Sequence, residues 1–107
     1  MATYEVTVSR SGSAVVTSWS PSPTGSGDPA NKYQFASGDI IKFKKASTDS
    51  VSVGSSSGFL NSSPGSLSTT FISRTVQSTA SNHTLTYSIT YSDGGGGFGG
   101  GGFGGGT

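Results

Sequence analysis

The first 93 residues alternate short apolar and polar runs, the period-two pattern of half-buried β-strands. Clusters of Gly, Pro, Ser, Asn and Asp separate these runs and favour turns, whereas apolar residues at helical spacing are almost missing. The runs cover residues 4–8, 15–19, 40–43, 51–53, 67–72 and 85–91. We therefore predict an all-β domain over residues 1–93, a small antiparallel Greek-key β-sandwich of about seven strands.

Residues 94–107 differ from this body, because they contain two GGGGF units and a short Gly remnant before Thr107. Ordering this segment costs about 14–28 kcal/mol of backbone entropy, whereas burying Phe98 and Phe103 returns only about 3–6 kcal/mol. Its backbone therefore needs hydrogen-bond partners, for example as an added strand. We predict an extended Gly/Phe-rich C-terminal tail that engages neighbouring subunits, with Phe98 and Phe103 as partner-binding residues.

Charge and residue content exclude several functional classes. Charged residues make up 10% of the chain, against about 25% in an ordinary globular domain. A net charge of +1 offers no basic face for nucleic acid, and no run approaches the roughly 20 apolar residues of a membrane helix. Because the chain has no Cys, disulfides and zinc knuckles are excluded. We expect neither a nucleic-acid partner nor a membrane partner.

Two stretches resemble the cupredoxins, the small blue-copper sandwich proteins. The first is FASGDIIKFK at residues 35–44, similar to their third-strand region, and the second is YSITY at residues 87–91. The resemblance implies a β-sandwich. Cupredoxins bind copper through two His, one Cys and usually a Met, but the corresponding positions fall near Asp49 and near Tyr91 or Ser92. The resemblance therefore implies the fold without electron transfer.

Candidate catalytic chemistry is sparse. GSSSG at residues 54–58 matches the G-x-S-x-G pattern with Ser56 at the nucleophile position, but a hydrolase needs a helix after it, which SSPG disfavours. The single histidine, His83, is expected at a turn and on the surface. Asp residues near turns are expected to cap them, and they lack the D-x-D-x-D spacing of a calcium loop. We predict no catalytic, cofactor-binding or metal-binding residues, no cofactor and no enzymatic activity.

Most aromatic residues alternate with polar neighbours and are expected in the core. Two are candidates for exposed anchors: Trp19, which precedes a Pro-rich loop, and Phe59, which lies in a polar loop. We therefore predict partner-binding roles for Trp19 and Phe59. Lys42 and Lys44 share one face of a strand, where they form a solvated basic surface.

These observations favour a non-enzymatic structural protein of a bacteriophage virion, specifically a capsid decoration or cement protein. Its partners would be the major capsid protein or further copies of itself as a homo-oligomer. Residues 1–6 run directly into strand-like sequence without a secretory signal, which suits synthesis in the host cytoplasm and function in the virion. Two alternatives remain open: a host- or glycan-binding module of a tail fibre, and a subunit of a bacterial surface filament, either of which would be extracellular or at the cell surface.

Overall fold

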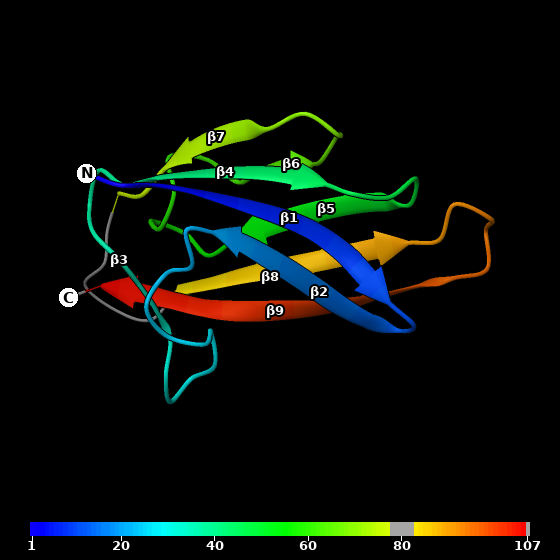
Figure 1. Cartoon of the computed structure of the whole chain (residues 1–107), viewed down its shortest axis with the longest axis horizontal. Coiled ribbons are helices and arrows are strands. Elements are labelled where there is room, and N and C mark those ends of the chain that lie inside the picture. Colours follow the sequence, from blue (N-terminus) through cyan, green and yellow to red (C-terminus); the bar gives the residue numbers. More distant parts are fainter. Residues whose placement is uncertain (78–82, 107) are drawn as a thin grey trace.

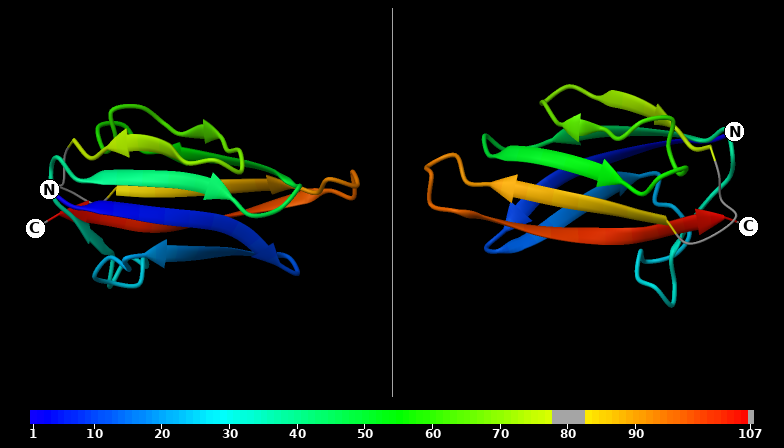
Figure 2. Two further views of the ribbon diagram at one scale, coloured as in Figure 1. Left: turned by 45° about the horizontal axis from the view of Figure 1, so that its top comes forward. Right: turned by 180° about the vertical axis from the view of Figure 1, so that it is seen from behind.

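The computed structural model describes residues 1–77 and 83–106, and these residues form strands and loops without a helix. Two sheets lie one behind the other (Figures 1 and 2). The first sheet has the order β2-β1-β4-β7 and the second has the order β3-β9-β8-β5-β6. The strands are β1 (Thr3–Ser11), β2 (Ala14–Ser20), β3 (Tyr33–Phe35), β4 (Ile40–Lys45), β5 (Ser50–Ser55), β6 (Gly65–Ser66), β7 (Ile72–Thr75), β8 (His83–Thr90) and β9 (Gly97–Gly106).

Both sheets are mixed, which corrects the prediction of an antiparallel sandwich. In the first sheet, β1 runs antiparallel to β2 but parallel to β4, with Val6 paired to Phe43. In the second sheet, β3 runs parallel to β9, whereas β8 is antiparallel to both of its neighbours. The predicted all-β, two-sheet architecture is confirmed.

The core lies between the two sheets and follows the alternation seen in the sequence. Val6, Val8, Ile41 and Phe43 project inward from the first sheet, and β5 and β8 contribute alternate residues from the second. The buried apolar residues are Val6, Val8, Phe35, Ile41, Phe43, Val51, Val53, Phe59, Leu60, Leu67, Val76, Leu85, Tyr87 and Ile89. One continuous cluster therefore holds the sheets together.

The residues that the structure describes form nine strands, against about seven predicted, because short strands carry little periodicity. β3 and β6 have only three and two residues. The predicted run at 67–72 lies too early in the chain, because the strand β7 begins at Ile72 and Leu67 precedes it as a buried loop residue. The other five predicted runs correspond to β1, β2, β4, β5 and β8.

The glycine-rich segment forms β9, the ten-residue strand between β8 and β3. Its register with β8 runs from Gly97 opposite Thr90 to Gly104 opposite His83. The backbone of this segment therefore finds hydrogen-bond partners within its own domain. Figure 1 shows the β8–β9 hairpin projecting beyond the other strands at one end of the molecule.

Candidate interaction surfaces

The four predicted partner-binding residues occupy different environments. Phe59 is fully buried, at 0% exposure, and packs against Phe35 with ring centroids 5.8 Å apart. Its predicted exposure is therefore wrong: the loop that carries it folds over the end of the core, although its polar neighbours suggested a surface position. Trp19 is half-buried at the rim of the core, with its ring 5.2 Å from that of Tyr33.

The two phenylalanines of β9 differ in what the structure describes. Phe98 is half-buried, packs against the core and meets Tyr91 edge to face, with ring centroids 5.6 Å apart. The backbone of Phe103 pairs with Thr84, and its side chain lies outside the described part of the chain. Phe98 therefore helps to anchor β9 to its own domain.

The structure brings Ser56 and His83 together. Ser56 Oγ lies 3.0 Å from His83 Nδ1 and also accepts the N–H of Thr84 at 3.0 Å. The imidazole is buried, which corrects its predicted surface position, and it stacks on Phe59 with centroids 5.1 Å apart. Its Nε2 is buried without a hydrogen-bond partner among the described residues.

This pair lacks two parts of a hydrolytic site. Within residues 1–77 and 83–106, no carboxylate hydrogen-bonds to His83, whereas in a triad an acid orients the imidazole. Ser56 is followed by turn and bridge residues instead of the helix of a nucleophile elbow. The contact therefore ties the end of β5 to the start of β8.

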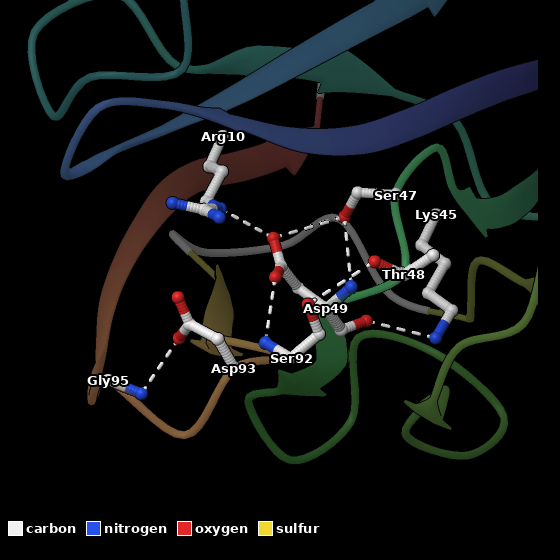
Figure 3. A network of polar contacts seen from close by, with 8 residues as sticks. All are labelled: Arg10, Lys45, Ser47, Thr48, Asp49, Ser92, Asp93 and Gly95. Atoms are coloured by element: carbon white, nitrogen blue, oxygen red, sulfur yellow. Dashed lines mark hydrogen bonds and ion pairs between the residues drawn. The ribbon is translucent and has the colours of Figure 1, made fainter.

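Asp49 is the centre of a polar network that joins the β4–β5 turn to β1 and to the residues that follow β8 (Figure 3). Its carboxylate accepts hydrogen bonds from the Ser92 backbone N–H at 3.0 Å and from Arg10 Nε, an ion pair between β1 and the β4–β5 turn. Ser47 Oγ donates to the same carboxylate at 3.3 Å, and Lys45 Nζ donates to the Asp49 carbonyl at 2.9 Å.

The network shifts both ionisable partners toward their charged forms. The Ser92 N–H and then the Arg10 guanidinium lower the pKa of Asp49, and the hydrogen bond that Arg10 donates to Asp49 raises the pKa of Arg10. Arg10 also lies over the ring of Tyr91 at 4.2 Å, so the base of the β8–β9 hairpin is attached to β1. These contacts give Asp49 a structural role, because its carboxylate links β1 to the residues that follow β8.

Asp39 also has a structural position, as predicted for a turn Asp. It is buried and accepts the backbone N–H groups of Ala2 and Ala36, each at 2.8 Å. The described residues contain no group of three or more His, Asp or Glu side chains that could hold a metal ion. None of them belongs to a helix long and apolar enough to cross a membrane.

The outer face of the second sheet carries no charge across β5, β8 and β9. Three rungs of the ladder read Ser50–Thr90–Gly97, Ser52–Ser88–Gly99 and Gly54–Thr86–Gly101. We call the surface formed by these three rungs the hydroxyl–glycine face. A shallow hollow of about 460 Å³ lies over its β8 and β9 part. The alternating Thr and Ser residues at 84–90 are the sequence signal for this face, because they predict outward strand positions that repel a neighbouring copy little.

The outer face of the first sheet is different. Glu5, Lys42 and Lys44 lie half-exposed on β1 and β4, where they alternate with buried apolar residues. Lys44 Nζ lies 4.8 Å from the centre of the Phe71 ring, which is 37% exposed. The solvated lysine face predicted from the sequence lies on β4, an inner strand of its sheet.

Glycine is required at β9 because the strand approaches its neighbours closely. A Cβ on Gly97, Gly99 or Gly101 would lie 2.3, 2.8 or 2.9 Å from a carbonyl oxygen of β8. On the inner face, a Cβ on Gly100 would lie 3.2 Å from Val15, and one on Gly104 would lie 3.2 Å from Phe59. Strand β9 can therefore lie this close to its neighbours only because these positions carry no side chain.

A cleft of about 340 Å³ opens between β2 and β9, at the side of the molecule where the two sheets end. We call it the β2–β9 cleft, and its lining carries no formal charge. It is lined by Ala14, Val15, Thr17, Ser26, Gly27, Tyr33, Tyr87, Gly99, Gly100, Gly101 and Gly102. Burial raises the pKa of the Tyr87 hydroxyl above its ordinary value.

Comparisons with protein-family profiles, with curated proteins and with solved structures find no match for this chain. The cupredoxin resemblance therefore stays a prediction.

Proposed function

We propose that this protein is a non-enzymatic structural protein of a bacteriophage virion, a capsid decoration or cement protein that packs against other protein subunits. The observation that carries the proposal is the hydroxyl–glycine face. Its three rungs contain only Ser, Thr and Gly, so neither charge nor a large side chain separates it from an opposing surface.

The energetics of such a face suit repeated close packing. Burying a charged side chain at an interface costs several kcal/mol unless it is paired, and this face carries none. Serine and threonine hydroxyls can both donate and accept, so they can pair with an opposing backbone or with hydroxyls of the same kind. Their short side chains also lose little rotamer entropy on contact.

The two outer faces differ in a way that favours one orientation on a particle. Lys42 and Lys44 are best solvated and would remain toward solvent. The hydroxyl–glycine face would then lie toward the capsid surface. The Greek-key connectivity and an engagement of neighbouring subunits by the C-terminal segment belong to this proposal.

The test is binding to virions isolated on a density gradient from the source of the chain. Purified protein is added to particles stripped of surface proteins, and the bound fraction is measured after sedimentation. We expect Thr86→Lys and Ser88→Lys, which place charge on the hydroxyl–glycine face, to reduce binding at least tenfold. Ser18→Lys, on an exposed position of β2 in the other sheet, is the matched control and should bind normally.

Absence of the protein from virions, together with no binding of the purified chain, would overturn the proposal. Binding that is lost equally in the Ser18→Lys control would show that charge in general is responsible. In the first case, glycan and host-cell binding assays test the alternative role as a tail-fibre module.

A further inference from the structure

Strand β9 has a free edge along most of its length. β3 pairs only with Gly104–Gly106, so residues 97–103 have β8 on one side and no strand of the described chain on the other. Figure 2 (right) shows β9 along the border of its sheet with β3 near its C-terminal end. In an antiparallel ladder, alternate residues direct their N–H and C=O groups away from the partner. This edge therefore presents unpaired backbone donors and acceptors.

This edge also lacks the features that normally prevent strand addition. Natural sheets guard their edges with short strands, inward charges, Lys, Pro or bulges. Here β6 and β3 are short, and β7 carries Arg74, which pairs with the buried Ile41 of β4 and so lies on the inner side of β7. Residues 97–103 contain only Gly and Phe.

The β2–β9 cleft, of about 340 Å³, lies beside Gly99–Gly102 of the free edge. A strand added at the usual spacing of about 4.8 Å from β9 would extend the second sheet beneath β2. It would cover Val15 and Tyr33, which line the cleft and are half-buried. The cleft lining carries no charge that would have to be desolvated.

We propose that the occupant is the same edge of a second copy of this chain, so that two β9 strands pair antiparallel about a two-fold axis. The two five-stranded sheets then join into one continuous sheet. Two identical edges offer matching donors and acceptors, as an isologous interface requires. With a net charge of +1 per chain, electrostatic repulsion between copies is small.

The register of this pairing follows from the position of β3. A two-fold axis perpendicular to the sheet places one residue of β9 opposite itself in the second copy. Gly100 is the middle of the free stretch 97–103. Centring the pair on a later residue would place the incoming strand where β3 already pairs with Gly104. Gly100 therefore gives the longest pairing of the free stretch that avoids β3, and the two strands are centred on this residue.

This inference rests on the proposed assembly role for its biological purpose, but it is tested on the purified chain alone. Mass is measured by light scattering across a concentration series, with circular dichroism as the check on folding. We expect a dimer that dissociates on dilution. Ala14→Lys and Ser26→Lys place a lysine at exposed positions of the cleft and should weaken dimerisation at least tenfold. Ser18→Lys, on the same strand as Ala14 but outside the cleft, should dimerise like the parent.

A distance measurement tests the geometry. The chain has no Cys, so Ser52→Cys introduces a single spin-label site on β5. Five strand spacings separate the two β5 strands in the joined sheet, which places the labels about 25 Å apart. A distance in this range supports the β9 pairing, and a dimer with a clearly longer distance overturns it.

The outcomes separate this inference from the proposed function. A folded protein that stays monomeric at every concentration, or a dimer unaffected by both cleft lysines, overturns the β9 pairing even if the chain binds virions. A dimer with the expected label distance supports the pairing even if virion binding fails. Normal dimerisation of Ser18→Lys beside weakened dimerisation of both cleft variants completes the support.

Discussion

Gly99 lies so close to the backbone of Tyr87, the neighbour of its cross-strand partner on β8, that a Cβ on Gly99 would lie 2.8 Å from the carbonyl oxygen of Tyr87. Real Cβ atoms essentially never approach backbone atoms to this distance, so an added methyl group would push the two strands apart. The close approach of the two strands therefore requires glycine at this position, so glycine here serves packing and not chain flexibility.

We therefore expect Gly99→Ala to destabilise the domain by about 1–3 kcal/mol, as an overpacked site does. Gly54 is the matched control: it lies on the same outer face, in β5, and a Cβ there meets nothing within 4 Å. Gly54→Ala should be neutral or stabilise by about 0.5 kcal/mol, because alanine restricts the unfolded chain. Urea unfolding measures both, and equal effects of the two substitutions would refute the packing argument.

Deletion of residues 94–107 should prevent folding. β9 lies between β8 and β3, and Gly104 lies against the rings of Phe59 and Phe35, so the deletion would open the core to water. The measurement is the dispersion of amide signals in a heteronuclear NMR spectrum, with a shorter deletion of Thr107 alone as control. A well-dispersed spectrum from the larger deletion would show that the first 93 residues fold independently.

Stability should fall in acid partly through Asp49. Its pKa is lowered in the folded state below the ordinary value of 3.8, first by the Ser92 N–H and then by Arg10. The ionised carboxylate therefore stabilises the fold above its unfolded pKa, and this contribution is lost as pH falls through the lowered, folded-state pKa. Asp49→Asn should be less stable near neutral pH and lose less stability in acid.

The check is urea unfolding at several pH values from about 7 to about 2. Asp28→Asn is the control, because Asp28 is exposed and its hydrogen bonds lie within one loop. It should retain the pH dependence of the parent protein. An Asp49→Asn profile parallel to that of the parent would contradict the assignment.

The Ser56–His83 contact should be structural. We expect a fluorophosphonate probe, which labels activated serines, to leave Ser56 unmodified, because His83 has no orienting carboxylate among the described residues. Ser56→Ala should cost about 1 kcal/mol through loss of the bond from the Thr84 N–H. Ser57→Ala, at the exposed neighbouring position, provides the control for stability. Labelling that disappears in Ser56→Ala would establish an activated nucleophile instead.

The sequence by itself determined the all-β class and five of the strand positions. Period-two alternation is local, so residues such as Val6, Val8 and Ile41 reveal their inward direction without knowledge of any partner strand. It also determined that residues 94–107 need backbone partners, because two phenylalanines cannot offset the entropy of ordering so many glycines.

Only the tertiary structure decided which strands pair, because strand pairing depends on residues that are far apart in the sequence. The parallel contact of β1 with β4 and the burial of Phe59 both depend on segments distant in the sequence. Glycine has no side chain and hence no periodicity, so β9 could not be placed before its close approach to β8 was known. The free edge beside Gly100 exists because β3 stops after three residues, a limit that no local pattern records.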